Sequence, residues 1–193
     1  MTLLILGLVI FLGVHAVRIF ADDWRTRQIA KLGANTWKGL YALASLVGFG
    51  LIAWGYGMAR MEPILIWSPP VWTRHLAALL TVFAFVFMVA VYIPRNSIKA
   101  RLHHPMILGV KVWALAHLLA NGTLADLLLF GAFLIWSIFD FRAARQRDRK
   151  AGTRYAAGTA LGTVTAVVVG LAAWAAFAFW LHALWIGVSP FGG

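Results

Sequence analysis

Two histidines stand inside stretches that are otherwise suited to lipid. His15 lies in FLGVHAVRIF, and His117 closes the stretch HHPMILGVKVWALAH. An ionisable side chain within an apolar span is costly, so each is a functional candidate whose partner must be named. Two neutral imidazoles on facing helices are a standard way of holding a haem iron from both sides. The alternative is that each histidine ties two helices together through ring hydrogen bonds.

Other notable polar or aromatic residues have simpler interpretations. His182 lies near the predicted end of a span, where it would face water or headgroups, and Asp126 in NGTLAD is expected to cap a helix. Pro105 suits the first turn of a helix, so His104 before it would be interfacial. Trp113 lies deeper and is expected to pack in the bundle or to form the wall of a pocket.

No other catalytic pattern is present. The chain contains no cysteine, which excludes disulfides, thiolate metal ligands and cysteine nucleophiles. It has no G-x-S-x-G, no Walker A and no H-E-x-x-H motif, and its acidic residues are scattered. Hydrolase and ATPase functions are therefore not expected.

The composition places these histidines in a membrane protein. Of the 193 residues, 62% are hydrophobic and 12% are charged, and the mean hydropathy is +0.83. A bilayer core of ~30 Å needs roughly 20 apolar residues per helix. We therefore predict an all-α, polytopic integral membrane protein, a single domain over 1–193 with about six transmembrane helices. The predicted spans cover about 2–20, 37–58, 71–93, 106–120, 124–141 and 164–188.

Basic residues predict the orientation of this bundle. Fifteen of the 17 Lys and Arg residues lie in or beside the first, third and fifth loops. The positive-inside rule places these loops in the cytoplasm, with both termini periplasmic, in a bacterial inner membrane. RAARQRDRK then reads as a solvated loop that also meets anionic lipid, so the expected partner is the lipid bilayer and not nucleic acid. In this orientation His117 lies several ångströms deeper from the cytoplasm than His15.

The stretches GLVIFLGVHAVR and RLHHPMILGVKVWALAHLLANG resemble the NnrU family of membrane proteins over nearly the whole chain. This resemblance implies a link to denitrification and nitric-oxide metabolism. A related family is the 15-cis-zeta-carotene isomerase, a haem b protein, and that likeness implies His15 and His117 as axial ligands of the haem iron. It also implies isomerase-like or redox chemistry on a small apolar substrate or with a redox partner. The isomerase has a cysteine where this chain has Ala114, so thiolate ligation is not expected.

Two alternatives remain open. One is a non-enzymatic membrane factor for nitrogen-oxide respiration, in which the histidines only join helices. The other is a membrane methyltransferase, because the segment R-x-x-H-P-M-x-x-G around His104 resembles the segment that contacts S-adenosylmethionine in such enzymes. Downstream, however, the chain offers only Asp140 and Asp148 and no adjacent acidic pair.

Overall fold

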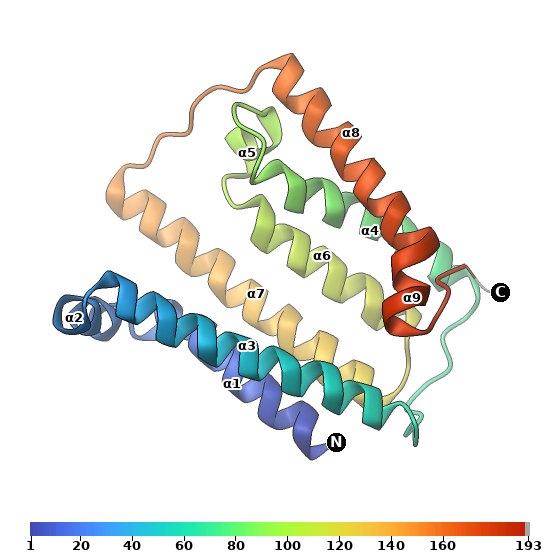
Figure 1. Ribbon diagram of the computed structural model, residues 1–193. Coiled ribbons are helices and arrows are strands. Elements are labelled where there is room, and N and C mark those ends of the chain that lie inside the picture. The colour runs from blue at the N-terminus through green and yellow to red at the C-terminus, as the bar shows by residue number, and fades with distance from the viewer. Residues whose placement is uncertain (192–193) are drawn as a thin grey trace.

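The computed structural model describes residues 1–191, and its regular elements are all helical within that range. The prediction of an all-α protein is confirmed (Figure 1). In chain order the elements are α1 (Thr2–Phe20), α2 (Asp22–Leu32), α3 (Ala34–Ala59), α4 (Trp72–Ala90), α5 (Ser97–Leu102), α6 (Pro105–Ala120), α7 (Leu124–Ala151), α8 (Ala160–Ala176), the π-helical turn η1 (Phe177–Leu181) and α9 (His182–Ile186).

Five helical segments are long and apolar enough to cross a membrane. They are α1, α3, α4, α7 and the continuous run from Ala160 to Ile186. The fourth predicted span, 106–120, corresponds to α6, whose 16 residues extend over only about 24 Å. This is a multi-pass membrane protein in which α6 is shorter than the ~30 Å apolar core.

Helix α7 and the last helix extend furthest beyond the membrane spans predicted for them. The predicted fifth span ends at 141, but α7 continues through 142–151, because the Arg, Ala and Gln residues of that segment are good helix formers. It ends where Gly152 adopts a left-handed conformation at φ 61°. The last helix begins at Ala160, not 164, where the Thr159 hydroxyl accepts a hydrogen bond from the Gly162 amide at 3.1 Å.

Helix α7 joins two groups of helices. It packs against α1 on one side and against α6 on the other, while α1 and α6 make no contact with each other among the described residues (Figure 1). Helix α3 packs closely along α1, and α4 packs against both α6 and α8. Residues of α1 and residues of α6 therefore approach each other only across the surface of α7 that lies between them.

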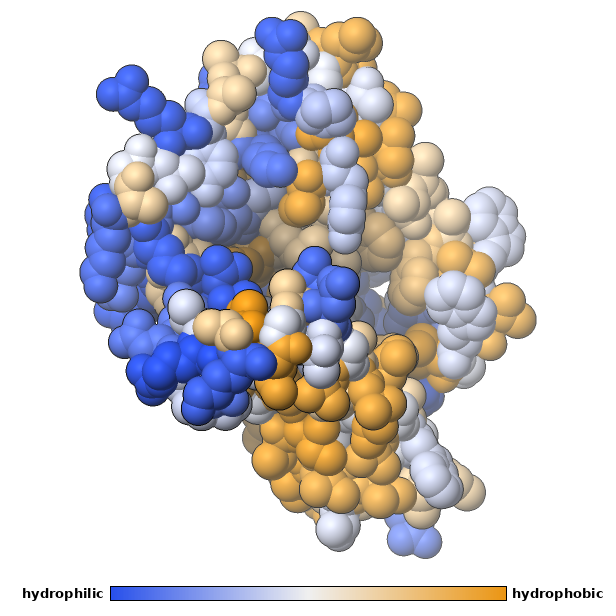
Figure 2. Space-filling model, turned by 60° about the vertical axis from the view of Figure 1, so that its left-hand side comes forward, coloured by the Kyte–Doolittle hydropathy of each residue, from blue (hydrophilic) through white to orange (hydrophobic). Residues whose placement is uncertain are grey.

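The polar and basic connections gather at one end of the bundle. Helix α2, helix α5 and the segment 152–159 lie at this end, whereas the N-terminus and α9 lie toward the opposite one (Figure 1). Figure 2 shows hydrophilic residues gathered on this side and hydrophobic residues over the helices. We call the side that holds α2, α5 and 152–159 the basic end.

Candidate functional site

A pocket with a volume of about 660 Å³ opens at the basic end. It lies between α1, α3 and α7, and the beginnings of α2 and α6 contribute to its rim. It is lined by Val14, His15, Val17, Arg18, Arg25, Trp37, Lys38, Tyr41, His104, Ile107, Trp136, Asp140, Ala144, Arg147, Asp148, Ala151 and Thr153. Two of the predicted site residues, His15 and His104, thus line one pocket.

His15 presents a free ring nitrogen in this pocket. Its Nδ1–H donates to the carbonyl oxygen of Phe11, one turn earlier on α1, at 2.6 Å. Because a neutral imidazole carries a single proton, Nε2 then holds the lone pair that can bind a metal or accept a hydrogen bond. The ring stacks on Phe11 at a centroid distance of 4.3 Å and meets Trp136 edge-on at 6.0 Å.

Trp136 carries an unsatisfied donor. Its indole Nε1 is buried and has no hydrogen-bond partner within the described part of the chain. A buried N–H without an acceptor is unusual in a folded protein and calls for an explanation. Because Trp136 lines the pocket beside His15, a bound ligand with an acceptor atom could accept the hydrogen bond from this Nε1–H.

At the rim, His104 belongs to a polar cluster that joins α6 to α7. Its Nε2–H donates to Oδ2 of Asp148 at 2.8 Å, and the Tyr155 hydroxyl donates to the same oxygen at 2.9 Å. Partial burial, with the hydrogen bond to Asp148 and the charge of that carboxylate, raises the pKa of Tyr155 to about 12. His103 stacks on Tyr155 at 4.2 Å and accepts a hydrogen bond from the Arg145 guanidinium. The Nε2 of His104 is therefore already engaged.

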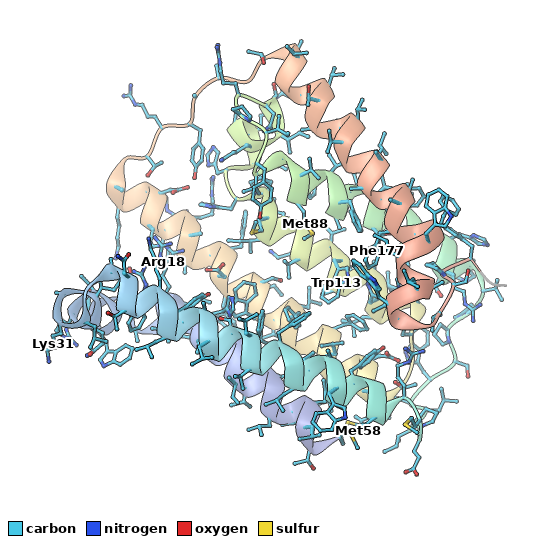
Figure 3. All side chains as sticks on the ribbon, viewed as in Figure 1. Arg18, Lys31, Met58, Met88, Trp113 and Phe177 are labelled. Atoms are coloured by element: carbon cyan, nitrogen blue, oxygen red, sulfur yellow. The ribbon has the colours of Figure 1, made fainter. Side chains whose placement is uncertain are left out.

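His117 lies outside the pocket, in an aromatic cluster nearer the opposite end. Its Nδ1–H donates to the carbonyl oxygen of Trp113 at 2.8 Å, and its ring stacks on Phe130 at 4.5 Å. Its ionisable neighbours are His182 and Asp126. Trp113, predicted to be a pocket wall, packs in this cluster, against His117 at 5.1 Å and Phe130 at 5.1 Å. Figure 3 shows Arg18 toward the basic end and Trp113 well away from it.

The structure does not bring the two predicted haem ligands together. His15 meets α7 at Trp136 and His117 meets it at Phe130, a separation of about 9 Å along the helix. Phe133 lies between them, 5.8 Å from Phe11 and 5.6 Å from Trp113. His15 and His117 thus contact α7 at different levels, and only His15 lines the pocket.

Asp126 caps α7 and also joins it to α3. Its side chain accepts hydrogen bonds from the backbone and hydroxyl of Thr123, at 3.0 and 2.6 Å, while the Thr123 hydroxyl accepts from the Asp126 amide. This is a capping box with Thr123 as the N-cap residue. The Tyr56 hydroxyl donates to the other oxygen of Asp126 at 2.5 Å. The predicted capping role of Asp126 is confirmed.

A comparison with protein families identifies the chain. The family model described as NnrU protein matches residues 3–190. The chain belongs to the NnrU family. Searches of curated proteins and of solved structures found no match. The resemblance seen in the sequence is thus confirmed, and it covers both the pocket and the aromatic cluster of this NnrU protein.

The residues of the pocket fit a b-type haem held by one histidine. The volume lies within the range of small-molecule and cofactor sites. The Nε2 of His15 is an atom of the type that ligates haem iron, the indole of Trp136 lies beside it, and the basic rim suits the acidic groups of a porphyrin. No group of three or more His, Asp or Glu side chains among residues 1–191 could hold a bare metal ion.

Several residues of the pocket were not predicted. Tyr41 and Lys38 line it from α3, and Tyr155 completes the rim cluster. The position of Tyr155 could have been predicted from the sequence. The helix-forming residues of 142–151, followed by Gly152, indicate a helix that ends at 152. The chain then turns, so Tyr155 stays near Asp148.

Proposed function

We propose that this NnrU-family protein binds b-type haem in the pocket at its basic end, where Nε2 of His15 would hold the iron. The observation that supports the proposal is the hydrogen bond from Nδ1–H of His15 to Phe11, which fixes the tautomer and leaves Nε2 free in a pocket of suitable size. A bound haem would supply a redox-active iron that can bind small ligands such as nitrogen oxides.

The residues of the chain hold and orient this ligand. The Phe11 carbonyl and the stacked Phe11 ring fix the direction of the His15 imidazole, as partners of a ligating histidine generally do. Tyr41 and Trp136 flank the imidazole at 5.2 and 6.0 Å and restrict the access of water to it. The proposal requires His15 alone, and ligation by both His15 and His117 is the alternative.

The biological role that we propose for this haem site comes from the likeness to the NnrU family. It is a function in nitrogen-oxide metabolism, linked to denitrification. Isomerisation of a small apolar substrate, as in the related carotene isomerase, would use the same pocket. If the protein does not bind haem, the alternative is a non-enzymatic membrane factor for nitrogen-oxide respiration.

The proposed location is the bacterial inner membrane, with the basic end in the cytoplasm and both termini in the periplasm. The chain has no cysteine, so Lys150→Cys and Thr2→Cys introduce single labels at the two ends. A membrane-impermeant maleimide added to intact spheroplasts should label the Thr2→Cys variant and not the Lys150→Cys variant. The reverse pattern would refute the orientation.

A spectrum tests haem binding. The protein, purified in detergent and supplemented with haem, should show a Soret band and a reduced-minus-oxidised difference that are lost in His15→Ala. His75→Ala is the control, because His75 is exposed at the start of α4 and does not line the pocket. Absence of a Soret band in the wild type, or an unchanged band in His15→Ala, would contradict the proposal.

A second candidate, binding of S-adenosylmethionine, is favoured by one specific observation. His104, Asp140 and Asp148 line the same pocket although they are distant in the sequence, so carboxylates do accompany the histidine-proline segment. Isothermal titration with S-adenosylmethionine tests this candidate. Binding that is lost in His104→Ala would favour it, and no binding at millimolar cofactor would remove it.

A further inference from the structure

The mouth of the pocket holds cations that lack anionic partners. Arg18 and Lys38 both line the pocket, yet neither forms an ion pair or a side-chain hydrogen bond among residues 1–191. Arg147 has Asp140 as a partner at 3.7 Å, a loose contact. The other acidic residue of the pocket, Asp148, is engaged by His104 and Tyr155. Asp140 lies close enough to Arg18 to interact with its charge, but neither acidic residue of the pocket forms an ion pair with Arg18 or Lys38.

The charge balance of the pocket is positive. Its lining contributes four Lys and Arg residues and two Asp residues, which leaves a formal charge of +2 with the histidines neutral. A cleft lined by one sign of charge focuses its field and concentrates ligands of the opposite sign. Negatively charged ligands are therefore favoured at this mouth.

The unpaired donor of Trp136 points to the same chemistry. Its buried Nε1–H needs an acceptor, and the guanidinium of Arg18 and the ammonium of Lys38 are also donors only. The buried Trp136 donor has no acceptor within residues 1–191, and the exposed Arg18 and Lys38 have no acceptor from the protein, whereas the carboxylates already have partners. A ligand acceptor with negative charge would suit all three donors.

We propose that the mouth of this pocket recognises the acidic groups of an amphipathic ligand through Arg18 and Lys38, while the apolar body of the ligand lies against Trp37, Tyr41 and Trp136. This inference rests on the proposed function, in which the ligand is a porphyrin whose two carboxylates face the mouth. The same chemistry would accept the phosphate of an anionic lipid headgroup. Guanidinium and ammonium groups bind both kinds of oxyanion.

Metal-free protoporphyrin IX is the probe, because it has the carboxylates of haem but no iron for His15 to bind. Its binding to the full-length protein in phosphatidylcholine nanodiscs is measured by quenching of tryptophan fluorescence, against empty nanodiscs as the baseline. The dimethyl ester of the same porphyrin provides the neutral comparison. The wild type should bind the diacid about tenfold more tightly than the ester, since a hydrogen bond to a charged group has roughly that effect.

The double variant Arg18→Gln/Lys38→Gln should lose this preference. The matched control is Arg27→Gln/Lys31→Gln, which removes the same charge from α2 at positions that do not line the pocket. The control should keep the preference for the diacid. Equal binding of acid and ester by the wild type, or equal losses in the two double variants, would overturn the inference.

The source of the acidic group is separated by adding phosphatidylglycerol to the nanodiscs. Diacid binding that weakens more in the wild type than in Arg18→Gln/Lys38→Gln supports recognition of a lipid phosphate at the mouth. Binding that weakens equally in both supports the porphyrin as the ligand. The two proposals can fail separately. If the protein shows no haem spectrum but still prefers the diacid to the ester, ligation by His15 is refuted and recognition of the acidic groups is not.

Discussion

His15 and His117 contact the same helix, α7, at Trp136 and Phe130, two positions that are about 9 Å apart along its axis. Both imidazoles donate Nδ1–H to the backbone carbonyl four residues earlier. Both histidines therefore carry their proton on Nδ1, but their surroundings differ. Only His15 lines the pocket at the basic end, and this difference separates the roles that the sequence assigned to them jointly.

The first prediction concerns these two histidines. His15→Ala should abolish the Soret band of the haem-supplemented protein, whereas His117→Ala should retain it, because His117 lies outside the pocket. Absorption spectra of the oxidised and reduced proteins provide the measurement. Loss of the band in both variants, with unchanged helicity by circular dichroism, would instead support ligation by both histidines.

The second prediction concerns the close packing of α1 and α3. A Cβ atom at Gly55 would overlap the Leu4 amide nitrogen, and one at Gly48 would lie 2.7 Å from that of Phe11. Gly55→Ala should therefore force the helices apart and lower the free energy of unfolding by about 1–3 kcal/mol. Unfolding in mixed micelles of detergent and SDS measures this change.

Gly57→Ala is the matched control for Gly55→Ala. A Cβ atom at Gly57 would meet nothing within 4 Å, so the replacement should be neutral or slightly stabilising, as Gly→Ala generally is within a helix. Equal effects of Gly55→Ala and Gly57→Ala would show that α1 and α3 are not held at this distance.

The third prediction concerns the bond between Tyr56 and Asp126. It is 2.5 Å long and joins α3 to the capped beginning of α7. Tyr56→Phe leaves the buried carboxylate without this donor, so the free energy of unfolding should fall by about 1–3 kcal/mol. Tyr92→Phe is the control, since Tyr92 is 75% exposed. A Tyr56→Phe variant as stable as Tyr92→Phe would contradict the role of this bond.

The fourth prediction concerns the titration of Tyr155, which lies outside the spans. Its pKa is raised to about 12 by partial burial and by Asp148, against an ordinary value of about 10. Because the raised pKa belongs to the folded state, the phenol contributes stability below about pH 10, and this contribution is lost as the pH rises through about 12. Ultraviolet absorbance of tyrosinate, compared with that of Tyr155→Phe, isolates this group.

Asp148→Asn tests the cause of that shift. Removing the carboxylate should bring the pKa of Tyr155 down toward 10, because the negative charge and the charged acceptor both disappear. An unchanged titration of Tyr155 in Asp148→Asn would mean that the hydroxyl does not bond to this carboxylate.

Local sequence features predicted most of the helical architecture. Runs of apolar residues identified the spans, since a backbone in lipid must satisfy its hydrogen bonds within each segment. Hydropathy did not predict the end of α7, because it marks where lipid contact stops. It does not mark where a helix stops, and the basic residues after 141 continue the helix until Gly152.

The sequence by itself determined the membrane class, the helical fold, the family likeness and His15 as a candidate ligand, because each depends on local composition or on a short motif. Only the tertiary structure decided which candidates share a site. Because α7 separates α1 from α6, it places His117 in an aromatic cluster and leaves His15 in the pocket with His104, Arg18 and Lys38. Their spacing in sequence carries no information on that arrangement, which arises from the packing of three helices.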